Sequence, residues 1–189
     1  MKRKIGLLLS ILLLLVSASA QTVRVDGGTY LSVYDLGLQC PRQVMWMLRS
    51  ADLGDASRNP AWRFDADIED TLAVARHDDF KGSGFHRGHM CPAADRSSSL
   101  VAMRSTFKMS NVAPQMPAVN VGTWKSTETF CRSAAKTYDS VCVVAVPVFL
   151  DRDTVRLRRG RIAVPHAFFK AVWLPATDSV LNAWFIFNE

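Results

Sequence analysis

Several features that define common protein classes are missing from this sequence. It contains no internal repeat, no low-complexity tract and no Pro/Ser-rich linker, so nothing divides it into separate domains. No apolar run reaches the roughly 20 residues that a membrane-spanning helix needs. No two of its four cysteines have the Cys-x-x-Cys spacing that is typical of structural zinc sites.

The N-terminal segment has the pattern of a signal peptide. Basic residues at 2–4 precede an apolar run at 5–16, and Ala-Ser-Ala at 18–20 supplies a small-residue cleavage site. We therefore expect a signal peptide at 1–20, a single domain at 21–189 and export to the periplasm or the extracellular medium. We expect no stable membrane association after cleavage, and a retained N-terminal anchor is the alternative.

Charge alone does not indicate a nucleic-acid partner. Removal of residues 1–20 takes away three basic residues and no acidic ones, which lowers the formal net charge from +6 to +3. The arginines are nevertheless clustered, and a solvated face explains such a cluster as well as a phosphate-binding surface does. One group follows the apolar run at 141–149 and consists of Arg152, Arg156, Arg158, Arg159 and Arg161. The other lies in or near residues 85–89 and consists of Arg87, Arg96 and Arg104.

The cysteine count favours disulfide bonds. Cys40, Cys91, Cys131 and Cys142 all lie after the signal peptide, and an even number in an exported chain allows three connectivities. The short separation between Cys131 and Cys142 favours that pair. Zinc ligation is the alternative for Cys91, which is close to two histidines, but the sequence shows no fourth ligand.

Hydrophobic periodicity predicts an α+β domain built on a mixed or antiparallel central sheet with flanking helices. We expect strands at 29–34, 37–50, 106–112, 165–173 and 183–187, and a buried central strand at 141–149. A loop or helix is expected at 92–105, and the polar stretch 51–84 contains a short turn or helix at 69–76. The spacing at 122–136 predicts a helix that buries Trp124, Phe130 and Ala134.

A few side chains have the chemistry of phosphoester hydrolysis. His89 could take a proton from water, and an arginine beside it could pair with a phosphate oxygen. Further along the chain are oxygen-bearing side chains of the type that suits a hard cation such as Mg²⁺, namely Asn111, Gln115, Asn120 and Glu128. Each of these residues taken singly also has a structural explanation, such as a hydrogen-bonded histidine, a capping asparagine or a surface glutamate. The residues alone indicate a hydrolase of a phosphoester.

Three blocks resemble the DNA/RNA non-specific endonuclease family. The segment 82–96, with Phe-His-Arg-Gly-His at 85–89, is similar to the family's Asp-Arg-Gly-His signature. The segments 106–115 and 120–128 resemble its Ser/Thr-Asn and Pro-Gln strand and its Asn-x-Gly-x-Trp-x-x-x-Glu helix start. The order and spacing of the three blocks are more specific than any single one, and the resemblance extends over about residues 30–189.

The resemblance implies a ββα-metal core and assigns roles by position. His89 would be the general base, Asn120 the direct ligand of Mg²⁺, with Mn²⁺ as a substitute, and Glu128 a carboxylate that holds metal-bound water. Arg58 would contact the phosphate, with Arg63 as a nearby competitor for that role, and Arg87 would assist.

Partners are also implied by the resemblance. The substrates would be DNA and RNA without regard to sequence, and a protein inhibitor would be a further partner. Asn111 and Gln115 would be nucleic-acid contacts.

One residue departs from the family signature. His86 stands where the family has the leading aspartate, a residue expected near the metal or in a hydrogen bond that steadies the motif. Two alternatives therefore accompany the prediction of an endonuclease. One is a catalytically weakened nuclease fold that binds nucleic acid, and the other is a phosphodiesterase that acts on small or lipid substrates.

Overall fold

The computed structural model describes residues 22–60, 62–63, 68, 74–150, 155–157 and 161–189. The predicted signal peptide, most of the predicted turn or helix at 69–76, and three of the clustered arginines (Arg152, Arg158 and Arg159) lie outside these residues. Within the part described, no helix is long and apolar enough to cross a membrane.

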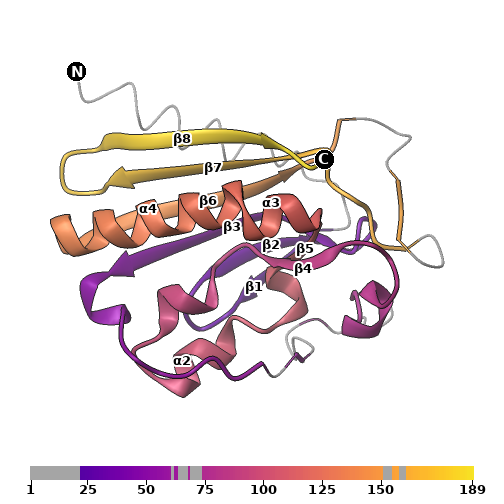
Figure 1. Ribbon diagram of the computed structural model, residues 1–189, viewed down its shortest axis with the longest axis horizontal. Coiled ribbons are helices and arrows are strands. Elements are labelled where there is room, and N and C mark those ends of the chain that lie inside the picture. The colour runs from indigo at the N-terminus through magenta and orange to yellow at the C-terminus, as the bar shows by residue number, and fades with distance from the viewer. Residues whose placement is uncertain (1–21, 61, 64–67, 69–73, 151–154, 158–160) are drawn as a thin grey trace.

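A six-stranded antiparallel sheet carries the rest of the molecule (Figure 1). Its spatial order is β1-β2-β3-β6-β7-β8, and each neighbouring pair runs antiparallel. The strands are β1 (Thr22–Asp26), β2 (Leu31–Asp35), β3 (Cys40–Arg49), β6 (Ser140–Val148), β7 (Ala167–Leu174) and β8 (Ser179–Phe187). The predicted central strand at 141–149 is thereby confirmed, because β6 lies between β3 and β7.

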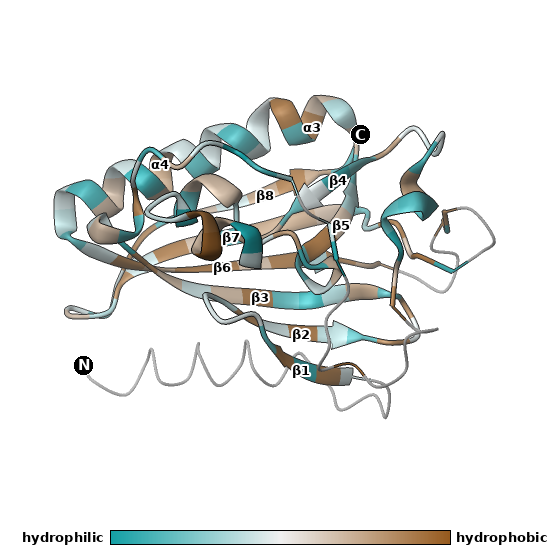
Figure 2. Cartoon of the chain, turned by 90° about the horizontal axis from the view of Figure 1, so that it is seen from below, coloured by the Kyte–Doolittle hydropathy of each residue, from teal (hydrophilic) through white to brown (hydrophobic). Residues whose placement is uncertain are grey.

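Two helices and a small two-stranded sheet lie on one side of the large sheet (Figure 2). The helices are α3 (Pro117–Val121) and α4 (Thr123–Tyr138), and the two strands are β4 (His86–His89) and β5 (Val112–Gln115). Short helical segments connect the rest: η1 (Ser50–Asp52), η3 (His77–Phe80), η4 (Ala93–Arg96), α2 (Leu100–Ser105) and η5 (Met109–Asn111). The prediction of an α+β fold with flanking helices is confirmed.

The main core fills the space between α4 and the large sheet. Trp124, Cys131 and Ala135 of α4 are buried there, and Val143 and Phe168 meet them from the sheet. The buried positions of α4 recur every three or four residues, and alternate residues of β6 face the helix. The predicted burial of Phe130 is wrong: it is 39% exposed, at the margin of that helix face, with its ring 5.2 Å from that of Trp184.

The predicted strand at 106–112 is wrong, because β5 starts only at Val112. The preceding residues form a turn and the short helix η5. The side chain of Asn111 explains the change of path, since its amide nitrogen donates to the backbone oxygens of Cys91 (2.8 Å) and Thr106 (2.9 Å). These bonds draw the chain into a tight loop where an extended strand was expected.

The predicted disulfides are not formed, and all four cysteines are free. Cys131 faces the core from α4, whereas Cys142 alternates with the core-facing Val141 and Val143 of β6. Successive side chains of a strand point to opposite faces of the sheet, so Cys142 lies on the face away from Cys131. Closeness in sequence was therefore a poor guide to this pairing.

The path of β4 leaves no room for a side chain at Gly88. Gly88 pairs with Ala113 of β5, and a Cβ atom at position 88 would overlap the side chain of Gln115. Gln115 is fully buried and has little freedom to move aside. Glycine at position 88 is thus required by close packing against β5.

Gly88→Ala should lower the free energy of unfolding by about 1–3 kcal/mol, the usual effect of overpacking a core. Urea unfolding of Gly88→Ala, Gln115→Ala and the double variant would measure it. The double variant should be less destabilised than the sum of the two single ones, because Gln115→Ala removes the overlap. Strict additivity would contradict this account of Gly88.

Candidate active site

His89, at the end of β4, is held between aromatic rings. Its imidazole lies 4.8 Å from the ring of Phe107, edge to face, and 5.0 Å from that of Trp62. Its backbone oxygen accepts a hydrogen bond of 3.1 Å from the indole nitrogen of Trp124 in α4. The residue is only 8% exposed, and its Nε2 has no hydrogen-bond partner among the residues that the structure describes.

The environment of His89 keeps its imidazole neutral. Burial, followed by the positive charges of Arg58 and Arg87, lowers the pKa of His89 from 6.5 to about 3. A neutral imidazole at physiological pH can accept a proton, which a general base must do. The position of the two arginines thus supports the same protonation state that base catalysis requires.

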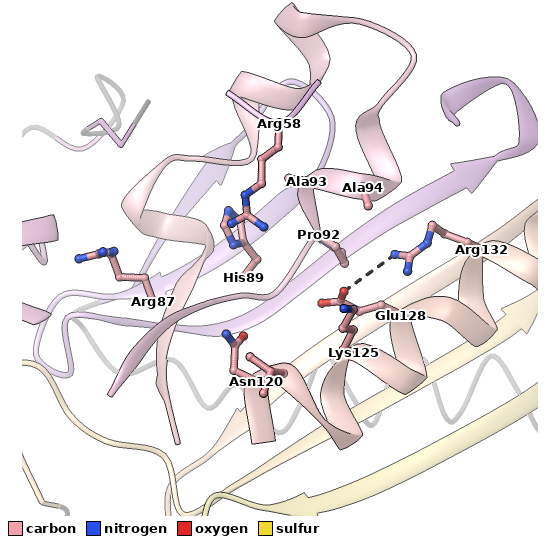
Figure 3. Close-up of a pocket in the computed structure, with 11 residues that line it drawn as sticks. Arg58, Arg87, His89, Pro92, Ala93, Ala94, Asn120, Lys125, Glu128 and Arg132 are labelled. Carbon is pink, nitrogen blue, oxygen red and sulfur yellow. Dashed lines mark ion pairs between the residues drawn. The ribbon is translucent and has the colours of Figure 1, made fainter. Parts of the chain in front are cut away.

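A cavity of about 290 Å³ brings together all five residues to which the family resemblance assigned a catalytic or metal-binding role (Figure 3). These residues are Arg58, Arg87, His89, Asn120 and Glu128. Arg63, the competitor for the place of Arg58, does not line this cavity; its guanidinium donates to the backbone oxygen of Arg104. Residues that lie up to 70 positions apart in sequence therefore share one site.

Asn111 and Gln115 are not part of this cavity, and both are fully buried. The side chain of Asn111 forms three hydrogen bonds with backbone atoms, including one accepted from the backbone nitrogen of Cys91 at 2.8 Å. Gln115 packs against Gly88. Neither side chain reaches a surface that nucleic acid could touch, so their predicted role is corrected from nucleic-acid contact to support of β4 and β5.

Asn120 and Glu128 reach the cavity from two different helices, not from one. Asn120 is in α3, Glu128 is in α4, and the chain breaks between them at Gly122. The Nδ2 atom of Asn120 lies 3.0 Å from Nδ1 of His86, so the imidazole that replaces the family aspartate contacts the amide directly. A side-chain amide with its nitrogen turned towards His86 presents its oxygen elsewhere.

A group of buried charges that the sequence analysis did not predict lies next to Glu128. Glu128 lies 3.9 Å from Arg132, which also donates to Asp95 at 3.1 Å. Lys170 of β7 is fully buried, and its Nζ lies 3.6 Å from the ring centroid of Trp124. One signal was present: lysine occupies the core-facing register of a strand that is otherwise apolar.

These buried charges change the acidities of one another. Burial raises the pKa of Glu128, while the positive charge of Lys170 opposes that rise. Burial lowers the pKa of Lys170, and the negative charge of Glu128 opposes that fall. Burial also raises the pKa of the fully buried Asp95, and the positive charges of Arg132 and Lys170 oppose that rise. The opposite charges thus compensate part of the cost of burial.

Oxygen atoms are the donors that this cavity offers to a metal. Among the described residues, no group of three or more His, Cys, Asp or Glu side chains could hold one. An amide oxygen from Asn120 and a carboxylate from Glu128 suit a hard cation that keeps most of its water, which is the preference of Mg²⁺. The donor set therefore fits a hydrated divalent cation better than zinc.

The site combines a histidine on a two-stranded sheet with an asparagine and a glutamate on the helices that follow. This arrangement defines the class of the protein as a ββα-metal nuclease core. The sequence model of the DNA/RNA non-specific endonuclease family matches residues 17–188 of this chain. The chain belongs to this family.

Individual relatives are similar over much of the chain. Mitochondrial endonuclease G from Bos taurus is 35% identical over 165 residues, which is 82% of this chain and 55% of the relative. Nuclease C1 from Cunninghamella echinulata var. echinulata is 38% identical over 110 residues, covering 53% and 44%. The chain therefore spans about half the length of these relatives.

A solved structure shares the fold. A crystal structure of a complex between EndoG and EndoGI superposes with a TM-score of 0.79, at 24% identity, over 88% of this chain and 74% of that one. This similarity supports the arrangement of sheet and helices.

The lowered pKa of His89 should make the metal-free protein sensitive to acid. Between pH 6.5 and about 3 the unfolded chain binds a proton at this position and the folded chain does not, so stability falls as the pH falls. By pH 5 the loss amounts to about 2 kcal/mol.

Chemical unfolding in EDTA at pH 7.5 and pH 5 would measure this effect. His89→Gln, which cannot titrate, should lose about 2 kcal/mol less than the natural chain between the two pH values. Equal losses in the two proteins would contradict a buried, neutral His89.

Proposed function

We propose that this protein is a metal-dependent endonuclease that hydrolyses phosphodiester bonds in DNA and RNA without sequence specificity. One observation carries the proposal: the buried, neutral His89 shares a cavity with Arg58, whose guanidinium is suited to binding phosphate. The same cavity contains the oxygen donors Asn120 and Glu128. Family membership supports the same reaction.

The residues of the cavity divide the work of hydrolysis. His89 takes a proton from the attacking water as the water oxygen bonds to phosphorus and the bond from phosphorus to the leaving oxygen breaks. The guanidinium of Arg58 donates hydrogen bonds to the phosphate oxygens, on which negative charge develops. Glu128 orients water near the phosphate, and Arg132 limits the movement of that carboxylate.

A divalent cation is the cofactor that family membership implies, with Mg²⁺ the natural candidate and Mn²⁺ a substitute. When bound, it neutralises charge on the phosphate and on the leaving oxygen. The Oδ1 atom of Asn120 would hold it directly and Glu128 through water. The contact between Asn120 and His86 favours this arrangement, because it engages the amide nitrogen and not the oxygen.

Substrate range and location follow from the same proposal. Binding through phosphate and metal accounts for indifference to sequence. The N-terminal pattern supports export out of the cytoplasm. The complex of the structural neighbour EndoG with EndoGI supports a protein inhibitor as a further partner.

Purified mature protein should nick and then degrade plasmid DNA and RNA in the presence of Mg²⁺, and EDTA should stop it. His89→Ala should lose at least about 10²-fold in rate, as expected for loss of a general base. His77→Ala is the matched control, because this exposed histidine does not line the cavity.

Gel electrophoresis of timed digests over several pH values would measure both rates. No metal-dependent cleavage at any pH would contradict the enzyme and would favour the alternative of a nucleic-acid-binding nuclease fold. Cleavage of a small phosphodiester that DNA does not inhibit would favour the alternative of a small-substrate phosphodiesterase.

His86→Asp should bind divalent cations more tightly, by about three- to tenfold, because it places a negative charge beside Asn120. Mn²⁺ titration followed by electron paramagnetic resonance would measure affinity independently of turnover. His86→Asn, which keeps a polar side chain but adds no charge, is the matched control. An unchanged affinity in His86→Asp would show that the histidine does not weaken the site.

A further inference from the structure

A second cavity of about 310 Å³ adjoins the first one. The two share three residues, Arg58, Arg87 and Asn120. The rest of the second lining comes from η3 and the residues before and within β4, together with Trp62: Trp62, Phe80, Lys81, Phe85 and His86. A ligand could therefore extend from one cavity into the other without leaving the surface that these residues form.

Arg87 lines both cavities, and its guanidinium is turned away from the catalytic residues. In Figure 3 its guanidinium points away from His89, Asn120 and Glu128, whereas that of Arg58 lies beside His89. A hydrogen bond of 3.0 Å to the backbone oxygen of His77 and a contact with the ring of Trp62, 5.3 Å from its centroid, fix this orientation. Arg87 is thus a prearranged cation at the margin that the two cavities share.

The charges of the two cavities differ. Both cavities are lined by cationic side chains, but the described lining of the catalytic one includes the carboxylate of Glu128, which suits a cation, and that of the second includes no carboxylate. The side chain of Lys81 is 79% exposed, and its ion pair with Asp78, which lies outside the lining, is long at 3.9 Å. Such a cavity suits an anion bound without a metal.

We propose that the second cavity binds the phosphate next to the scissile one on the same strand. This inference rests on the proposed function and deepens it. Two adjoining cavities that share Arg58 and Arg87 match a ligand whose phosphates repeat along a chain. A substrate with a single phosphodiester fills only the catalytic cavity, so the protein should select polynucleotides over small phosphodiesters.

Two short substrates test the second cavity. The dinucleotide TpT carries one phosphate and the trinucleotide TpTpT carries two, and the natural protein should have a KM at least about tenfold lower for TpTpT. Lys81→Gln should raise the KM for TpTpT about fivefold and that for TpT by less than twofold. Lys136→Gln, at an exposed position near the end of α4 and outside both cavities, is the matched control.

The salt dependence of binding gives a second readout that needs no turnover. In EDTA and on a His89→Ala background, the affinity for fluorescent oligothymidine should fall linearly with salt on logarithmic axes. The slope should be smaller by about 0.7 when Lys81→Gln is added, which is the effect of one lost contact with a single-stranded phosphate. Lys136→Gln should leave the slope unchanged.

The outcomes separate the two proposals. If Lys81→Gln behaves as Lys136→Gln does in both assays, or the natural protein shows equal KM values for TpT and TpTpT, the second phosphate site is wrong, while hydrolysis of either substrate still supports the endonuclease. If the natural protein hydrolyses neither substrate, nor plasmid, the endonuclease is wrong. The salt slope then decides the phosphate site by itself.

Discussion

The hydrogen bond from the indole of Trp124 to the backbone oxygen of His89 joins the three parts of the molecule that form the site. Trp124 belongs to α4, His89 ends β4, and the other side of the indole packs on the large sheet, with Phe168 at 5.3 Å and the ammonium of Lys170 at 3.6 Å. A buried indole must satisfy its single N–H, and here it does so on the strand that carries the candidate base. The position of His89 relative to Glu128 thus depends on one fully buried side chain, and any shift of α4 against the sheet would also displace the base.

Beneath this indole the protein buries both signs of charge. Lys170, Asp95 and Arg132 surround Glu128, and burial shifts the pKa of each carboxyl upward and that of the lysine downward. Isolated charges in such a place cost several kcal/mol each, whereas opposite charges together recover much of that cost. Among the described residues, the lining of the catalytic cavity is nevertheless cationic, because it places Arg58, Arg87, Lys125 and Arg132 beside the carboxylate of Glu128. In the proposed function, these cationic side chains attract the phosphates of the substrate.

Local pattern predicted five of the six strands of the large sheet, missing β1, but it did not predict the small sheet. β6 and β7 are apolar nearly throughout, and an apolar run of strand length is a signal that the local sequence carries by itself. The path into β5 depends instead on hydrogen bonds from Asn111 to residues 5 and 20 positions away, which no local periodicity encodes. The family motifs located His89, Asn120 and Glu128 correctly in one cavity. The motifs did not distinguish the residues that line the cavity from Gln115, which belongs to the same motif but is buried by packing. They also did not indicate Lys170, which lies outside all three motifs.

The free thiols have a bearing on how the chain reaches its folded state. Three of the four cysteines are fully buried, and burial raises the pKa of all four, to about 12 for Cys131 and about 11 for Cys142. A protonated thiol is a poor nucleophile, so oxidation and exchange at these positions are slow once the core has closed. No covalent cross-link has to form or rearrange before the site is assembled, and the slow steps that accompany disulfide formation are absent from folding.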